Sequence, residues 1–145
     1  MHAGEGFGAV SVRQAVHVCG ADRIGHATRL FEDPSLAAYV NDRRLPLEIC
    51  LTSNVQTRAA LSYEEHPLRR YFDEGQVVTL NTDNRLMSGI TLTDEYWHAA
   101  AEQGFTLAEL ADVAVNGFAA AFLPWQERRV LIERARAEIA ALLGP

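Results

Sequence analysis

Short apolar runs alternate with longer amphipathic segments along the chain, and this alternation limits the possible folds more than any other sequence feature. The runs that we predict to be strands are residues 21–27 (ADRIGHA), ending at His26, residues 45–51 (LPLEICL), and residues 76–83 (QVVTLNTD), ending at Asp83. The opening HAGE, residues 2–5, looks like the end of a fourth strand. Because the intervening segments are long enough to be crossover helices, the pattern predicts an α/β fold with parallel strands.

Capping residues and prolines predict where the helices begin and end. Ser11 is predicted to cap the first helix and Gly20 to end it, while Asp33 before Pro34 should start the second. Further helices are predicted over residues 68–75, around residues 95–103, from Thr106 with Glu109 three residues later, and from Pro124 to about residue 143.

Composition argues against several classes of protein. The 145 residues are 48% hydrophobic, which suits one globular domain over residues 1–145, and the dispersed net charge of -6 does not favour nucleic-acid binding. The chain has neither the roughly 20 apolar residues of a membrane span nor an opening signal peptide, so we expect a cytoplasmic protein. Cys19 and Cys50 lack metal-like spacing and are expected to pack as small apolar residues.

Polar side chains stand at the predicted carboxyl ends of the strands. These are His2 and Glu5 in HAGE, His26 and Asp83. Parallel β/α folds build their sites at this edge, because the loops there converge. Each residue alone also has a structural interpretation: a solvated chain end, a hydrogen-bonded histidine at the edge of the core, or a turn or helix-capping aspartate.

Four motifs taken together favour the interpretation of these residues as a site over the structural interpretations. In order, HAGE, RIGHA, LEICLTSN and LNTDN resemble the motifs of the adenosine deaminase family of zinc-dependent aminohydrolases. The resemblance covers nearly the whole chain and implies the C-terminal half of a TIM (β/α)8 barrel followed by C-terminal helices. It also implies Zn2+ as the cofactor and a purine nucleoside as the substrate.

The resemblance assigns a role to each site residue. It implies that His2 and Asp83 are zinc ligands, that Glu5 protonates the purine at N1, and that His26 orients and helps to deprotonate the attacking water. Asn84 and Gly4 are implied to contact the substrate. The implied reaction is hydrolytic deamination of adenosine and deoxyadenosine to inosine products and ammonia, in purine salvage, by attack of zinc-activated water at C6.

The sequence departs from the family pattern in several places. Asn84 stands where the family often has a second aspartate, with Arg85 where many members carry proline, and Ala27 follows His26 where glycine is common. The H-x-H pair that supplies two more zinc ligands is not found. The remaining histidines stand singly and are predicted to be surface or packing residues: His17, His66 and His98.

Several alternatives remain open at this point. A related aminohydrolase could act on adenine, or on a modified adenosine such as aminofutalosine. A half barrel leaves two sheet edges open, so we expect it to need the remaining N-terminal half or self-association for completion. The non-enzyme alternative is a catalytically inactive half barrel that pairs its open edges, as a homodimer or with a binding partner.

Overall fold

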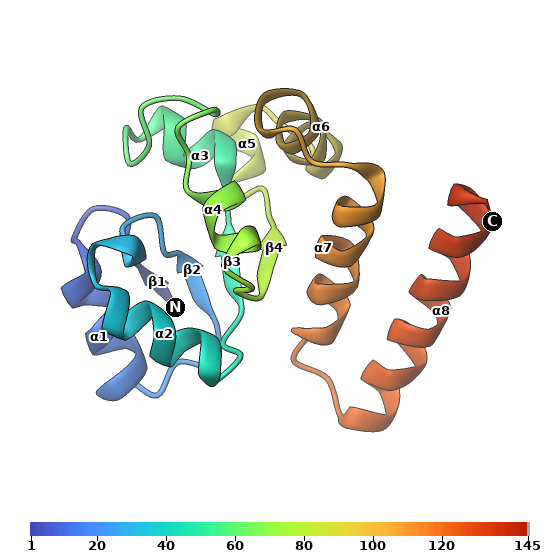
Figure 1. Ribbon diagram of the computed structural model, residues 1–145, viewed down its shortest axis with the longest axis horizontal. Coiled ribbons are helices and arrows are strands. Elements are labelled where there is room, and N and C mark those ends of the chain that lie inside the picture. Colours follow the sequence, from blue (N-terminus) through green and yellow to red (C-terminus); the bar gives the residue numbers. More distant parts are fainter. Residues whose placement is uncertain (145) are drawn as a thin grey trace.

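Four short parallel strands form one sheet in the computed structural model, which describes residues 1–144 (Figure 1). The strands are β1 (His2–Ala3), β2 (Ile24–His26), β3 (Leu47–Ile49) and β4 (Val78–Leu80). They lie side by side in sequence order, with every neighbouring pair parallel. The predicted α/β class and all four predicted strand positions are therefore confirmed.

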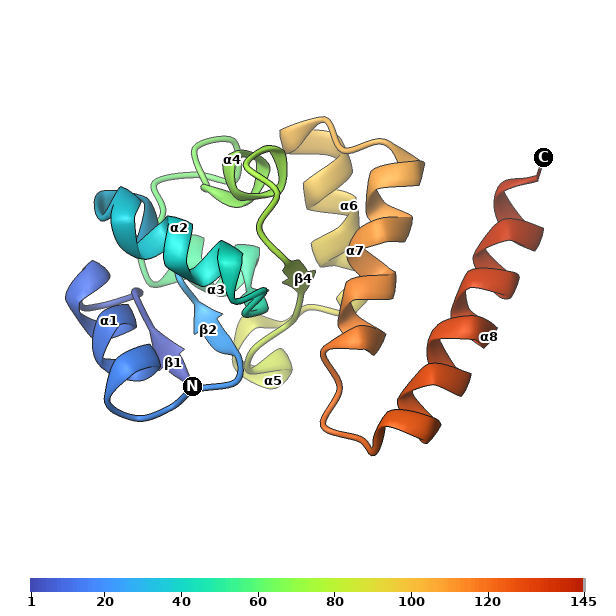
Figure 2. The same ribbon diagram turned by 60° about the horizontal axis from the view of Figure 1, so that its bottom comes forward.

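Helices follow the strands in the expected alternation, and the last four of them extend the chain beyond β4. Their bounds are α1 (Ala9–His17), the 3-10 helix η1 (Leu30–Glu32), α2 (Pro34–Asp42), α3 (Leu51–Gln56), α4 (Leu68–Asp73), α5 (Arg85–Ser88), α6 (Leu92–Gln103), α7 (Leu107–Ala119) and α8 (Trp125–Leu143). Helix α7 packs against β4, and α8 lies on the outer side of α7, away from the sheet (Figures 1 and 2). No helix among residues 1–144 combines the length and apolarity that crossing a membrane requires.

Most predicted helix ends agree with the structure. The carboxylate of Asp33 accepts a hydrogen bond from the backbone N–H of Leu36 at 3.0 Å, with Pro34 in the first turn of α2. Thr106 and Glu109 form the expected capping box of α7. Helix α8 begins after Pro124 and ends at Leu143, as predicted.

The predicted cap of the first helix is wrong. Helix α1 begins at Ala9, with Gly8 as its N-cap, and ends at His17, before the predicted stop. The Ser11 hydroxyl instead accepts a hydrogen bond from the backbone N–H of Gly4 at 2.8 Å. Ser11 thus fixes the loop after β1, because its hydroxyl is already committed to that loop.

Two predicted strands are shorter than their apolar runs. Strand β3 ends at Ile49, and Leu51 already begins α3, which sequence analysis did not predict. Strand β4 ends at Leu80, so Asp83 lies in the turn beyond it with a φ of 53°. The short helices η1 and α5 were also not predicted.

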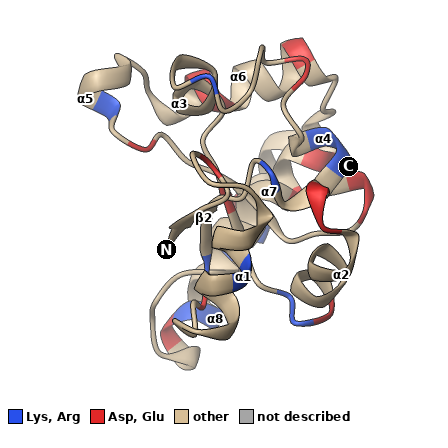
Figure 3. Ribbon diagram, turned by 90° about the vertical axis from the view of Figure 1, so that its left-hand side faces the viewer, with Lys and Arg blue, Asp and Glu red and all other residues tan. Residues whose placement is uncertain are grey.

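The core lies between the sheet and its covering helices. It contains fully buried side chains from the strands and from α1, α2, α4 and α7: Ile24, Leu47, Ile49, Val78, Val12, Val40, Tyr71 and Val113. The Tyr71 hydroxyl also donates to the carbonyl oxygen of Ala27 at 2.8 Å, which ties α4 to the end of β2. Basic and acidic residues are interspersed over the helices (Figure 3), and ion pairs four residues apart, such as Arg134 with Glu138, lie along α8.

Glu95 of α6 explains the unpredicted helix α3. Its buried carboxylate accepts hydrogen bonds from the backbone N–H groups of Leu51 at 2.6 Å and Thr52 at 3.0 Å. These groups belong to the first turn of α3, which has no side-chain cap of its own. A residue 44 positions from Leu51 in the chain therefore fixes the start of this helix.

Substituting Glu95 with Ala should lower the free energy of unfolding by about 2 to 4 kcal/mol, because two buried N–H groups lose their acceptors. Urea denaturation of the chain measures this loss. Glu95→Gln is the matched control: it keeps one acceptor oxygen and should lose less stability. Equal stability of Glu95→Ala and the unchanged chain would show that Glu95 does not hold α3 in place.

Candidate active site

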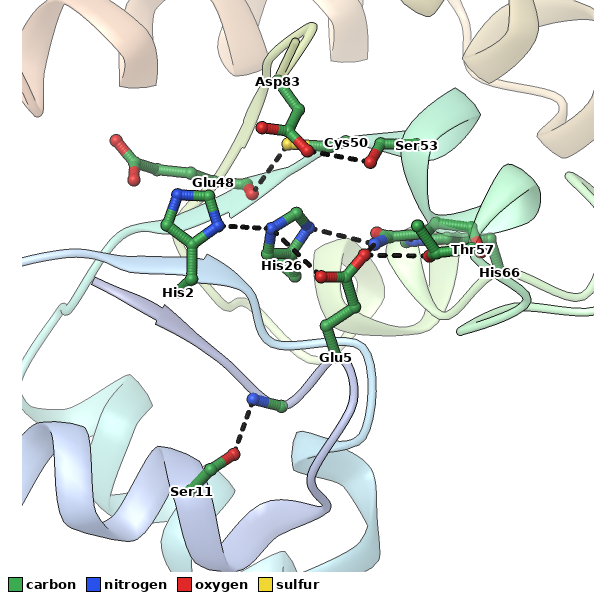
Figure 4. Close-up of polar contacts among 12 residues, drawn as sticks. His2, Glu5, Ser11, His26, Glu48, Cys50, Ser53, Thr57, His66 and Asp83 are labelled. Atoms are coloured by element: carbon green, nitrogen blue, oxygen red, sulfur yellow. Dashed lines mark hydrogen bonds and ion pairs between the residues drawn. The ribbon is translucent and has the colours of Figure 1, made fainter. Parts of the chain in front are cut away.

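The carboxyl ends of the strands bring the predicted site residues together. His26 is the last residue of β2, Glu5 follows β1 by two residues, and Asp83 follows β4 by three. In Figure 4 the side chains of His2, Glu5, His26 and Asp83 converge at this edge. Residues as far apart in sequence as His2 and Asp83 thus meet at one place, as the strand pattern predicts.

The backbone at this edge is strained. His26, Ala27 and Asp83 have φ angles of 69°, 52° and 53°, in the left-handed region that residues other than glycine rarely adopt. Such conformations cost about 1 to 3 kcal/mol each and concentrate at functional sites. The geometry at the ends of β2 and β4 is therefore held by the surrounding structure.

Three of these side chains form a possible metal-binding cluster. His2, His26 and Asp83 each offer one ligand atom, and these atoms lie within 4.8 Å of one another. His2 Nδ1 and His26 Nε2 are 2.7 Å apart. Burial lowers the pKa of His26, so its ring stays neutral at physiological pH. Imidazole nitrogen and carboxylate oxygen are ligands that zinc accepts, so the donor set fits this ion.

Helix α3 supplies hydrogen bonds to the site. The Ser53 hydroxyl donates to Asp83 Oδ2 at 2.8 Å. The amide of Asn54 contacts Glu5 Oε1 at 3.2 Å and His26 Nδ1 at 3.0 Å, and the Thr57 hydroxyl donates to Glu5 Oε1 at 2.9 Å. One short helix and its C-cap residue Thr57 therefore position Asp83, His26 and Glu5 together.

The polar residues of LEICLTSN were not predicted to belong to the site. The available signal was a run of small polar side chains directly after a predicted strand, at Thr52, Ser53 and Asn54. The predicted strand ends at Leu51, directly before these residues, and the helix that carries them was not predicted.

His66 is a buried residue, 3% exposed, which fits the packing interpretation and not the surface one. Its Nε2 lies 3.0 Å from Asn54 Oδ1, and its Nδ1 accepts a hydrogen bond from the backbone N–H of Leu68 at 3.1 Å. Burial lowers the pKa of His66 to about 3. His66, for which no functional role was predicted, is thus connected to the site through Asn54.

The low pKa of His66 predicts a specific acid sensitivity. In the unfolded chain His66 has a pKa of about 6.5, so between this pH and about pH 3 the unfolded state binds more protons than the folded state. Stability should therefore fall with decreasing pH, by up to roughly 1.4 kcal/mol per pH unit from this residue. Urea denaturation over this pH range measures the slope, which His66→Gln should reduce. An identical slope in both proteins would contradict the prediction.

The other two single histidines pack against tyrosine rings. His98 stacks on Tyr63 with ring centroids 3.9 Å apart, and exposed His17 lies 4.7 Å from the ring of Tyr39. Of the cysteines, Cys50 is buried as expected, and burial raises the pKa of its thiol. The expectation that Cys19 is packed is wrong: it is exposed just beyond α1, whose helix ends before reaching it.

Gly4 and Asn84 have structural roles in addition to the predicted substrate contacts. Gly4 has a φ of 78°, and a Cβ atom there would lie 2.8 Å from Val12 Cγ2, so packing requires glycine. The Asn84 side chain caps α5 by accepting from the backbone N–H of Met87 at 3.3 Å. This leaves the Nδ2 group of Asn84 to donate elsewhere, next to Asp83.

Comparison with known proteins shows the family of the chain. The family model described as adenosine deaminase matches residues 1–138. The chain belongs to the adenosine deaminase family. One curated relative, adenosine deaminase 1 of Streptomyces coelicolor, is 44% identical over 91% of this chain and 36% of its own length. The chain spans about two fifths of the curated relatives that it matches.

Solved structures extend the likeness to the fold. Adenine deaminase of Arthrobacter aurescens superposes with a TM-score of 0.90 at 28% identity, over 95% of this chain and 42% of that one. An amidohydrolase from Burkholderia ambifaria with bound Zn has a TM-score of 0.81 over 97% and 42% of the two chains, and its 23% identity supports the fold alone. The four strands and their helices thus match about two fifths of a deaminase barrel.

Proposed function

We propose that this chain is the C-terminal part of a catalytic domain for zinc-dependent hydrolytic deamination of adenosine and deoxyadenosine, acting in purine salvage in the cytoplasm. The observation that carries the proposal is the convergence of His2, His26 and Asp83, with ligand atoms within 4.8 Å, beside the carboxylate of Glu5. Membership of the adenosine deaminase family supports the same chemistry.

In this proposal His2 and Asp83 hold the metal. When bound, zinc lowers the pKa of water from near 16 to about 7, which makes a nucleophile available at neutral pH. The Ser53 hydroxyl fixes one oxygen of Asp83 and leaves the other free for the metal. Two protein ligands are fewer than the three that catalytic zinc sites usually have, so we propose that the unmatched part of the family's length supplies further ligands.

Glu5 is the proposed general acid. Its Oε1 accepts hydrogen bonds from Asn54 and Thr57, while its Oε2 lies 3.6 Å from His26 Nε2. Because Oε1 is occupied by two donors, the transferable proton belongs on Oε2. The reaction then balances as follows: water oxygen bonds to C6 of the purine, N1 takes the proton of Glu5, and one proton of the water passes to the amino nitrogen. The bond from C6 to the amino nitrogen breaks to release ammonia, and the proton left on the C6 oxygen returns to Glu5.

His26 and Asn84 are the proposed orienting and binding groups. His26 is buried at the end of β2 and held by Asn54, so its ring has a fixed direction toward Glu5 and His2. We propose that it orients the attacking water. Asn84 keeps an N–H that can donate to the purine at N7. We propose that the backbone of Gly4 also contacts the substrate.

Adenine is the second candidate substrate, because the solved adenine deaminase has a TM-score of 0.90 with this chain. The experiment that separates the two measures kcat/KM for adenosine, deoxyadenosine and adenine. It uses the zinc-loaded chain co-expressed with the part of a family member that this chain does not match. Faster turnover of the nucleosides supports the proposal, and faster turnover of adenine overturns the choice of substrate.

The same preparations test the non-enzyme alternative. We expect the isolated chain to associate through the free edges of β1 and β4, either with the complementary part or with a second copy. Size-exclusion chromatography with light scattering, with and without zinc, gives the mass of each species. A stable homodimer without turnover in any combination would favour an inactive, self-associating half barrel.

A further inference from the structure

A run of hydrogen bonds leads from the backbone of α4 to His26. The backbone N–H of Leu68 is 3.1 Å from His66 Nδ1, and His66 Nε2 is 3.0 Å from Asn54 Oδ1. The Asn54 amide nitrogen is in turn 3.0 Å from His26 Nδ1. Every side chain in this run is buried: His66 is 3% exposed, and Asn54 and His26 are inaccessible to solvent.

The first donor fixes the direction of the whole run. A backbone N–H can only donate, so His66 Nδ1 must accept. Neutral imidazole carries its single proton on the other nitrogen, so His66 Nε2 donates to Asn54 Oδ1. The Asn54 oxygen is then the acceptor and its Nδ2 group is the donor that faces His26 Nδ1. His26 Nδ1 consequently accepts, and the proton of neutral His26 lies on Nε2.

Two independent observations agree with this direction. Burial lowers the pKa of His66 to about 3, which keeps its ring neutral and its Nδ1 unprotonated. The Asn54 amide nitrogen also lies 3.2 Å from Glu5 Oε1. If the Asn54 amide were flipped, its oxygen would face the carboxylate oxygen of Glu5. Its NH2 group would then face the Nε2–H of His66, so that two donors would face each other.

We propose that His66 is a positioning residue that, through Asn54, keeps the proton of neutral His26 on Nε2. The N–H of His26 faces His2 Nδ1 at 2.7 Å in this structure. In the proposed function it is the hydrogen-bond donor that orients the attacking water. Nothing in this arrangement requires His66 to contact the substrate. The importance of His26 rests on the proposed function, whereas the direction of the hydrogen bonds does not.

The proposal also separates His26 from the other members of the metal-binding cluster. A protonated Nε2 has no lone pair for a metal ion, and His26 Nε2 is the nitrogen that faces His2 at 2.7 Å. His26 could ligate through Nε2 only if its proton moved to Nδ1, where Asn54 already donates. His2 and Asp83 therefore remain the metal-binding members.

Nitrogen-15 NMR of the histidine rings tests the proposal. The chain is labelled with 15N histidine, and long-range 1H–15N correlations at mildly alkaline pH identify the protonated ring nitrogen, with His26→Gln assigning the signal. The matched variants are His66→Gln, whose amide nitrogen can replace Nε2 as the donor to Asn54, and His66→Asn, whose shorter side chain cannot reach. We expect the proton on Nε2 of His26 in the unchanged chain and in His66→Gln, and a substantial shift to Nδ1 in His66→Asn.

The proposal is overturned if the unchanged chain carries the His26 proton on Nδ1, or if His66→Asn leaves its position unchanged in a folded protein. Backbone amide spectra establish folding. If His66→Asn does not fold, Asn54→Asp is the deciding variant. An ionised carboxylate only accepts hydrogen bonds, so Asn54→Asp should move the proton of His26 to Nδ1. A His26 proton that stays on Nε2 in this variant would refute the proposed series of hydrogen bonds. The measurement needs no substrate, so a chain with the expected tautomers but no deamination would refute the proposed function alone.

Discussion

Glu5→Gln is expected to lower kcat for adenosine deamination by about 10²- to 10⁴-fold, the contribution typical of a general acid. A glutamine amide still accepts hydrogen bonds from Asn54 and Thr57 through its oxygen, but it has no acidic proton for N1 of the purine. KM should change much less, because the shape of the side chain is retained. Steady-state kinetics on the chain completed by the unmatched part of a family member measure both constants.

The control for Glu5→Gln is Glu127→Gln, which makes the same chemical change at an exposed position on α8, away from the site. It should leave both constants unchanged. If Glu5→Gln retains more than about a tenth of kcat, Glu5 is not the general acid and the proposed proton transfer fails.

His2→Ala is expected to weaken zinc binding by roughly a hundredfold or more and to remove measurable deamination. Even residues that only support a metal ligand typically contribute 10- to 100-fold to affinity, and a ligand itself contributes at least as much. Metal analysis after dialysis against a weak chelator, together with the activity assay, measures both effects. His17→Ala is the matched control, because His17 is exposed on α1 and lies outside the metal-binding cluster. Full zinc content in His2→Ala would remove His2 from the proposed ligands.

The strand positions were predictable because they depend on local sequence. The apolar runs before His26 and Asp83 are bounded by turn residues and helix signals, so their order, and the meeting of their carboxyl ends, follows from the alternation of short and long segments. Asp33 and Thr106 were also predictable, because each caps a helix within its own first turn.

The residues that support the site could not be predicted in the same way, because their partners are distant in sequence. Helix α3 starts where Glu95 of α6 caps it, so an apolar run that resembles a strand becomes a helix halfway through. The hydrogen bond between Asn54 and His26 joins residues 28 positions apart in sequence, and the one between His66 and Asn54 joins residues 12 positions apart. A single histidine before a proline carries no sign of these contacts.

Ser11 shows how a correct residue type leads to a wrong boundary. Serine is a good N-cap, but α1 begins two residues earlier and the Ser11 hydroxyl bonds the loop that carries Gly4. The tertiary requirement of that loop, which must pass close to Val12 and Ala27, outweighs the local capping preference. The loop leads from β1 into Glu5, so this correction concerns the site directly.

The central claim is that this chain contributes His2, Glu5, His26 and Asp83 to one zinc-dependent deaminase site. The most direct measurement is formation of inosine and ammonia from adenosine by three preparations with zinc: this chain, the unmatched part of a family member, and the two co-expressed. We predict turnover in the co-expressed pair, its loss on removal of zinc, and little or none in either part alone. A co-purifying, zinc-loaded pair that releases no ammonia from adenosine would contradict the claim.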